Sequence, residues 1–170
     1  MADEISEARQ EGGGNDGPIL VTVDFSPDSE AALVWASQFA DCANANLVVL
    51  HVVHDPADAP GSYLERDADS LRPMEEVAKE KFGQFLEKVQ EQHPDLTALE
   101  DVETRLVKGI PATRILEMAK SLNARLIVMG SRGLTGLPHL LLGSKAERVV
   151  QMSPIPVTIV KAAMRDDPVD

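Results

Sequence analysis

Apolar residues gather in five short runs along the chain, and these runs alternate with segments of helical periodicity. Near-continuous runs rich in Val, Ile and Leu are typical of strands that are buried on both faces of a sheet. The run at 102–107 is more polar than the others, which indicates a position nearer the edge of the sheet. The expected strands cover residues 19–23, 47–53, 102–107, 126–129 and 156–160.

Four segments between these runs place apolar residues at helical spacing. The first helix is expected to begin at Ser26-Pro27, because serine suits an N-cap and proline suits the first helical turn. Further helices are expected over 73–92, from Pro111 onwards, and through 146–150. The predicted apolar stripe of the first helix is Ala31, Ala32, Trp35, Ala36, Phe39 and Ala40.

This alternation of strands and helices predicts an α/β fold, a five-stranded parallel sheet with helices on both faces. One domain is expected over 18–162, between a disordered, acidic tail at 1–17 and a second tail at 163–170. Residues 54–72 are expected to form a long loop. In such sheets ligands bind beyond the carboxyl ends of the strands, near the point where the strand order reverses. The loops that would share this edge follow Val23, Val53, Val107 and Met129.

Composition and charge narrow the classes of function. The net charge of −12 argues against broad nucleic-acid binding and against docking on anionic lipid, both of which need basic surface. No apolar run approaches the length of a membrane span, and no apolar signal region is evident, so a cytoplasmic protein is expected. The single cysteine, Cys42, excludes an intrachain disulfide, and its place in an apolar helix predicts a buried thiol.

Candidate chemistry is concentrated in the glycine-rich stretch MGSRGLTGLPHLLLGSK, residues 129–145. Its glycines match neither the dinucleotide fingerprint G-x-G-x-x-G nor the P-loop pattern G-x-x-x-x-G-K-[ST]. They do suit a phosphate cradle. Gly130, at a strand end, would let a ligand approach the backbone, and Gly133 can adopt a positive φ. Gly143 and Ser144 stand at a helix start, where backbone N–H groups and the helix dipole favour an anion.

Several residues around this stretch keep two interpretations at this stage. Arg132 and Lys145 either supply positive charge to an anion or point to solvent. Asp24, at the end of the first strand, either caps the following helix or contacts a ligand. The leucines at 140–142 pack either on the domain or on a partner. No metal-binding pattern is found in the sequence. The histidines at 51 and 54 are not expected to bind a metal together, because they would point to opposite faces of a strand.

The spacing G-x2-G-x9-G-S resembles the nucleotide-binding motif of the universal stress protein family. The stretches VTVDFSPDSEAAL, LVVLHVV and LLLGSKAERVVQMSPIPVTIVK are similar to strands and helices of that family, and the resemblance covers about 18–161. It implies an adenine-nucleotide alpha-hydrolase-like, Rossmann-like sandwich that binds ATP, ADP or AMP. It also implies a homodimer formed largely through the last strand, Val157–Val160, whose edge position would invite a second chain.

The resemblance implies a role for each matching residue. Asp24 would contact the adenine or the ribose, and Val52 would form an apolar wall for the base. Met129 and Gly130 would close the base and ribose region. The residues expected at the phosphates are Arg132, Gly133, Gly143 and Ser144. Lys145 replaces the small apolar residue usual after Gly-Ser, and whether it binds phosphate or faces water stays open. Mg²⁺ as a companion of ATP also stays open, since no carboxylate pair clearly claims it.

These observations lead to the hypothesis of an ATP-binding stress-response protein, a homodimeric sensor or regulator with an unknown protein partner. No catalytic residue is assigned, because no general base is evident for attack on the γ-phosphate. A slow ATPase or nucleotidyl-transfer enzyme on the same scaffold is the first alternative. A nucleotide-free interaction module is the second alternative. The glycine motif counts against it, because without a ligand nothing would require glycine at those positions.

Overall fold

The computed structural model describes residues 16–54, 74–100, 102–133 and 142–162. Most of the predicted tails and of the predicted 54–72 loop lies outside the described residues, as do the glycine and leucines at 134–141. In chain order the elements are β1 (Ile19–Thr22), α1 (Pro27–Ala43), β2 (Leu47–Val53), α2 (Met74–Gln92), the short 3-10 helix η2 (Thr97–Leu99), β3 (Glu103–Lys108), α3 (Pro111–Ser121), β4 (Leu126–Gly130), α4 (Ser144–Met152) and β5 (Val157–Val160).

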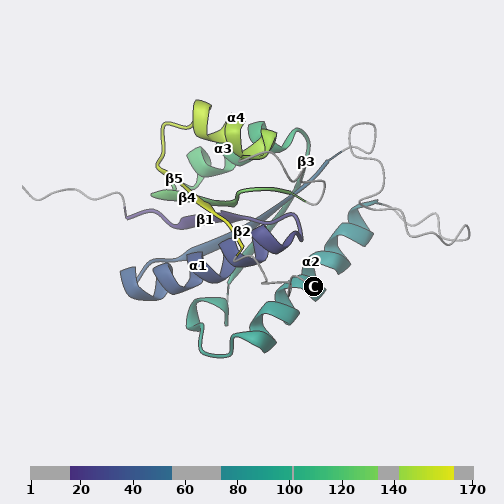
Figure 1. The fold of residues 1–170 in the computed structure, drawn as a ribbon, viewed down its shortest axis with the longest axis vertical. Helices are drawn as coiled ribbons and strands as arrows, with labels where there is room; N and C mark the ends of the chain where they lie inside the picture. The colour runs from purple at the N-terminus through teal and green to yellow at the C-terminus, as the bar shows by residue number, and fades with distance from the viewer. Residues whose placement is uncertain (1–15, 55–73, 101, 134–141, 163–170) are drawn as a thin grey trace, which may run out of the picture.

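The five strands form one parallel sheet in the order β3-β2-β1-β4-β5. Helices α1 and α2 pack on one face of the sheet, and α3 and α4 pack on the other (Figure 1). The predicted α/β sandwich is therefore confirmed. The edge positions expected for the strands near 102–107 and at 157–160 are confirmed as well, because β3 and β5 are the two outer strands.

The core consists of two apolar layers, one on each face of the sheet. Along β2, Leu47 and Val49 point into the layer under α1 and α2, whereas Val48 and Leu50 point into the layer under α3 and α4. All four side chains are buried, since β2 lies inside the sheet and is covered on both faces. This two-sided burial is why the inner strands are near-continuous apolar runs in the sequence.

Helix α1 begins where the sequence predicts. The Ser26 side chain is the N-cap and accepts a hydrogen bond from the backbone N–H of Ser29 at 3.2 Å, and Pro27 opens the first turn. Two finer predictions about this helix are wrong. Phe39 is 40% exposed and stacks on Trp35 near the surface, with ring centroids 5.3 Å apart, instead of entering the core. Cys42 is exposed, because it lies in the last turn on the outer side of the helix.

Other differences from the sequence prediction are small. Strand bounds shift by one residue at β1, β3, β4 and β5, which is the usual uncertainty of element ends. The 3-10 helix η2 was not predicted, because a single turn is too short to leave a periodic signal. Among the described residues, no helix has both the length and the apolar character that a membrane span requires.

Candidate functional site

The topology places the site-forming loops side by side at the carboxyl edge of the sheet. Strands β1 and β4 are neighbours, yet the chain leaves β1 toward β2 and reaches β4 only after α3. The strand order therefore reverses between β1 and β4, which is where ligands bind in folds of this kind. Asp24 follows β1 at this point, and the loop 131–133 follows β4.

Two apolar residues assigned to the base lie near this edge on a common face of the sheet. In the register, Thr22 of β1 is paired with Leu50 of β2 and with Met129 of β4. Met129 is buried in the layer under α3 and α4, and Val52 is half-buried and packs against the same layer. Side chains two residues apart on a strand share a face. The residues assigned to an apolar wall therefore lie on the side of the sheet from which α4 approaches.

The glycines of the motif are needed for close packing between segments of the site. A Cβ atom on Gly133 would lie 2.6 Å from Oδ2 of Asp24, and one on Gly143 would lie 3.3 Å from the carbonyl oxygen of Ser131. The Gly143 N–H also donates to that carbonyl oxygen at 2.8 Å. The segments after β1, after β4 and before α4 thus meet in one place.

The positive φ suggested for Gly133 is not found, and Gly130 has a packing role of its own. Among the described glycines, the one with a positive φ is Gly109, so Gly133 is not in the left-handed region. A Cβ on Gly130 would lie 2.8 Å from backbone atoms of Asp28 and Ser29 at the start of α1. Gly130 is therefore required for close packing of β4 against α1, whether or not a ligand is bound. A glycine at position 130 therefore does not count against a nucleotide-free interaction module.

Asp24 is tied to the chain turn that leads into α1, although it is not the cap of that helix. Its Oδ1 atom accepts hydrogen bonds from the backbone N–H of Ser26 at 3.2 Å and from the Ser26 hydroxyl at 2.5 Å. The helix cap is Ser26 itself. The other oxygen, Oδ2, is the atom that a side chain at position 133 would meet. Asp24 therefore does not cap α1 but stabilises the chain turn before this helix, at the edge of the site.

The start of α4 has the features expected of an anion-binding helix end. Gly143 is the N-cap residue, and no side chain among the described residues caps this terminus. Ser144 and Lys145 occupy the first turn and are exposed. Burial is the main cause of the lowered pKa of His51, and the positive charge of Lys145 makes a smaller contribution in the same direction. The first turn of α4 therefore offers backbone N–H groups, a hydroxyl and a cation at the same edge of the sheet.

His51 is a buried histidine beside the site, and no role was predicted for it from the sequence. Its Nδ1 atom lies 2.8 Å from the carbonyl oxygen of Val23, so the N–H is placed on Nδ1. Burial lowers the pKa of His51. The hydrogen bond with the Val23 carbonyl and the charge of Asp24 act in the opposite direction but are smaller, so the ring stays neutral near pH 7. The ring stacks on Phe25, with centroids 4.3 Å apart.

Phe25 is the unusual backbone position next to Asp24. Its φ of 67° lies in the left-handed region, which is strained for a bulky residue. Its ring contacts His51, Phe82 and Phe85 in the layer on the α2 side of the sheet. These aromatic contacts hold the strained turn that redirects the chain from β1 into α1.

Asp28, in the first turn of α1, is the second polar residue that the sequence analysis missed. Its Oδ2 atom accepts hydrogen bonds from the Ser131 hydroxyl at 2.5 Å, the Arg132 backbone N–H at 3.1 Å and the Arg132 Nε at 3.4 Å. Its Oδ1 atom accepts one from the N–H of Ala162 at 3.2 Å. Burial alone would raise the pKa of Asp28, but these hydrogen bonds and the charge of Arg132 outweigh it, and the pKa lies below its ordinary value.

Asp28 leaves little signal in the sequence, because its partners lie more than a hundred positions away along the chain. The one local signal was an acidic residue in the first turn of a helix that follows a site-forming strand. Helix-end acids are common for local reasons, so this signal does not predict a tertiary role.

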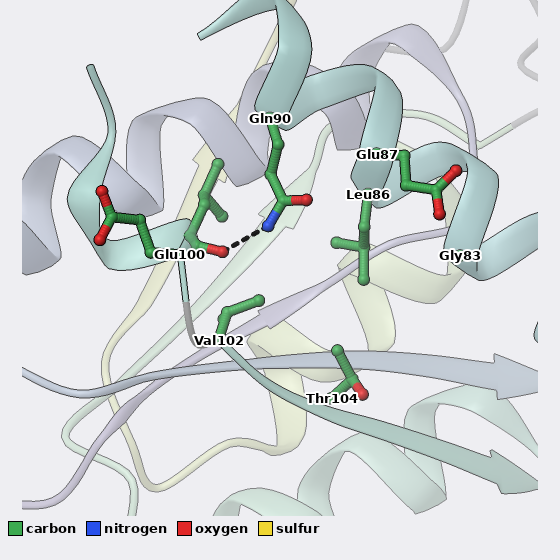
Figure 2. A pocket seen from close by; sticks show the side chains of 8 residues that line it. Gly83, Leu86, Glu87, Gln90, Glu100, Val102 and Thr104 are labelled. Carbon is green, nitrogen blue, oxygen red and sulfur yellow. Dashed lines mark hydrogen bonds between the residues drawn. The ribbon is translucent and has the colours of Figure 1, made fainter. Parts of the chain in front are cut away.

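Two hollows found within the described residues lie away from the carboxyl edge. One, of about 460 Å³, lies between α2, η2 and β3, where Gln90 donates to the carbonyl oxygen of Leu99 at 2.5 Å (Figure 2). A second, of about 540 Å³, lies at the amino end of β1 and β2 and includes Pro18 and Asn46. Neither includes a residue assigned to the nucleotide. Across the described ranges, no group of three or more His, Cys, Asp or Glu side chains is placed to hold a metal ion.

Comparison with known proteins gives a consistent family assignment. The model of the universal stress protein family matches residues 17–161. The chain is 36% identical over 149 residues to universal stress protein YxiE of Bacillus subtilis, covering 84% of this chain and 97% of that protein. It is 35% identical over 144 residues to a universal stress protein of Mycolicibacterium smegmatis, covering 85% of this chain but only 45% of the longer relative.

Solved structures agree with the sequence relatives. A universal stress protein crystallised in complex with cAMP superposes with a TM-score of 0.62 at 25% identity, over 86% of this chain and 98% of that chain. Structures of this family have the adenine-nucleotide alpha-hydrolase-like fold, which this chain shares. The family match, the sequence relatives and the fold agree, and the chain belongs to the universal stress protein family.

Proposed function

We propose that the chain binds an adenine nucleotide at the carboxyl edge of the sheet, with ATP as the leading candidate and ADP or AMP as alternatives. The main supporting observation is the convergence of three segments at the strand-order reversal. Asp24, the loop 131–133 and the first turn of α4 come from distant parts of the sequence, and Gly133 and Gly143 allow them to pack closely. The cAMP complex of a related protein supports adenine as the base.

In this proposal the apolar and the polar halves of the edge bind different parts of the nucleotide. Val52 and Met129 contact the base from the face under α3 and α4, and Asp24 accepts a hydrogen bond from the base or the ribose. The phosphates lie at the first turn of α4, where the helix dipole and backbone N–H groups favour negative charge. The phosphate contacts are then made by Arg132, Gly133, Gly143, Ser144 and Lys145.

The proposed biological role is that of a stress-response regulator whose conformation depends on nucleotide occupancy. It acts as a cytoplasmic homodimer that pairs through the edge of β5, and it presents the occupied site to a protein partner. Within the described residues β5 pairs only with β4, so its outer edge is available to a second copy. An antiparallel pairing of two β5 strands would give the twofold symmetry that most homodimers have.

The direct test is to denature the purified protein and to identify released ATP, ADP or AMP by mass spectrometry. Isothermal titration calorimetry with ATP, on protein stripped of nucleotide, should then show saturable binding. If neither experiment detects an adenine nucleotide, the proposal is wrong.

A matched pair of variants locates the binding site. Gly133→Ala should weaken ATP binding strongly, because the new methyl group displaces the Asp24 carboxylate. Gly83→Ala is the control, since it makes the same chemical change in α2 with no atom within 4 Å of the new Cβ. Equal ATP affinities for the two variants would show that the nucleotide binds elsewhere.

A further inference from the structure

Asp28 is a buried carboxylate that the proposed nucleotide contacts do not use. It is 5% exposed, and its two oxygens are engaged by groups from two other parts of the chain. One oxygen accepts from the N–H of Ala162, which follows the end of β5. This bond fixes the carboxylate relative to the sheet. The other oxygen is therefore a fixed acceptor that faces the loop after β4.

That second oxygen fixes the loop residues expected at the phosphates. It accepts from the Ser131 hydroxyl, the Arg132 backbone N–H and the Arg132 Nε. Ser26, the N-cap residue of α1, contacts the same loop, because its hydroxyl donates to the carbonyl oxygen of Arg132 at 3.2 Å. Position and backbone orientation of residues 131–133 are thus set by the first turn of α1.

The contact with Nε also orients the Arg132 side chain. A guanidinium group is planar, and its N–H donors point in fixed directions. When Asp28 holds Nε, the terminal nitrogens are the donors that can meet a second anion. The Arg132 side chain is 31% exposed, so it reaches the surface of the site while its inner end is anchored. A charge-assisted pair of this kind is stronger than a neutral hydrogen bond.

We propose that Asp28 is a positioning residue for phosphate recognition, which holds Arg132 and the loop 131–133 in the orientation that binds the phosphates of the nucleotide. This inference rests on the proposed function. It makes a prediction of unexpected sign. A negative charge near the phosphates should repel them, so its removal would strengthen ATP binding if Asp28 acted through its charge alone. If Asp28 positions Arg132, its removal weakens ATP binding instead.

The test compares ATP with adenosine, which lacks phosphates, by calorimetry on nucleotide-free protein. Asp28→Asn should bind ATP about tenfold more weakly than the wild type, because the charge-assisted contact that orients Arg132 toward the phosphates is lost. Its affinity for adenosine should be unchanged. Glu30→Gln is the matched control, because it removes the same charge from the first turn of the same helix, where the Glu30 side chain contacts Lys88 and not Arg132. Its ATP affinity should equal or slightly exceed that of the wild type.

A second variant keeps the test informative if Asp28→Asn folds poorly. Arg132→Lys retains the positive charge but has no Nε–H for Asp28 to hold, so it should lose ATP affinity to a similar extent without disturbing the buried carboxylate. Where Asp28→Asn folds, it should have little further effect on ATP binding in an Arg132→Ala background, and an equal loss of ATP affinity in both backgrounds would show that Asp28 does not act through Arg132.

The possible failures are distinguishable. A wild-type protein that binds neither ATP nor adenosine overturns the proposed function and this inference together. A wild type that binds both, with an Asp28→Asn variant that binds ATP equally well or more tightly, overturns the inference alone. Equal losses of ATP and adenosine affinity would assign Asp28 a general structural role and would also overturn it.

Discussion

Gly130 and Gly83 are the same residue type in opposite surroundings. A Cβ on Gly130 would lie 2.8 Å from backbone atoms of Asp28 and Ser29, and backbone atoms in a packed helix start cannot move aside easily. A Cβ on Gly83, in the middle of α2, would meet nothing within 4 Å. Glycine in a helix interior is unfavourable relative to alanine, mainly because it loses more backbone freedom on folding.

The first prediction follows from this contrast. Gly130→Ala should destabilise the fold by roughly 1–3 kcal/mol, as overpacking of a close contact does. Gly83→Ala should stabilise it by about 0.5–1 kcal/mol. Urea unfolding at neutral pH, followed by circular dichroism, measures both changes. If Gly130→Ala is as stable as the wild type, β4 and α1 can move apart without loss of stability, and the close packing does not require glycine at this position.

His51 makes stability depend on pH in a definite direction. Burial lowers the pKa of His51 in the folded protein below the ordinary histidine value of 6.5. Between that value and the lower folded pKa, the unfolded chain binds a proton that the folded protein does not. Stability therefore falls as the pH falls through this window, by up to about 1.4 kcal/mol per pH unit for one proton.

The second prediction is that the free energy of unfolding decreases as pH is lowered below about 6.5, and that His51→Gln reduces this slope. The variant loses the titrating group but keeps a polar side chain near the carbonyl oxygen of Val23. Urea unfolding at a series of pH values between 5 and 8 gives the comparison. Equal slopes in the wild type and in His51→Gln would exclude His51 as the source.

At the residue scale, some residues near the carboxyl edge of the sheet could be singled out from the sequence and others could not. Asp24 and the four motif residues at 130, 133, 143 and 144 could be named because their spacing is local or characteristic. Asp28 and His51 could not, because their roles depend on contacts made only after folding. For Gly133 the sequence suggested a positive φ, whereas the structure shows crowding against Asp24, a tertiary property that local spacing does not reveal.

At the scale of elements, the strands and helices could be predicted almost completely. A buried parallel strand needs apolar residues on both faces, so β1, β2 and β4 stand out as apolar runs. The helix face exposed to solvent was harder to predict. Phe39 fits the helical period of α1 but lies just beyond the face that the sheet covers, where it packs on Trp35. Periodicity gives a stripe, whereas the width of the covering surface decides which residues are buried.

Strand β5 shows what an edge position allows. The N–H of Ile127 donates to Pro156, and the N–H of Ser131 donates to Val160. In a parallel ladder, successive residues turn their backbone groups to alternate sides. Residues 156, 158 and 160 therefore face β4, and the backbone groups of Val157 and Ile159 face outward, toward the proposed second copy.

The third prediction uses this alternation to test the proposed dimer. Ile159→Pro removes an outward N–H without removing a bond to β4, since proline is tolerated on an edge strand where the N–H faces away from the sheet. It should convert the dimer to a monomer. Ile159→Ala shortens the same side chain but keeps the N–H, and it should remain a dimer. Analytical ultracentrifugation measures the mass. A dimer that survives Ile159→Pro would assign the interface to another surface.

At the scale of the whole molecule, the charge is strongly unbalanced. The chain has 28 acidic and 16 basic residues and a net charge of −12. Folding brings like charges closer together than they are in the unfolded chain, so a large net charge opposes the compact state. Polar contacts between opposite charges, such as Lys88 with Glu30 and Arg114 with Glu117, are exposed and contribute little. Long-range repulsion is therefore expected to outweigh the local attractions.

The fourth prediction is that salt stabilises this protein at neutral pH. The screening length falls from about 30 Å at 0.01 M salt to about 8 Å at 0.15 M, which removes most repulsion across the molecule while leaving buried contacts such as Asp28 with Ser131 nearly unchanged. The midpoint of thermal unfolding should rise by a few degrees over this range of NaCl concentration. Near the sequence pI of 4.7 the net charge is close to zero, so the same addition of salt should have little effect. An equal rise at both pH values would instead indicate a general salt effect on the solvent, because the net charge, and with it the net repulsion, is close to zero near the pI.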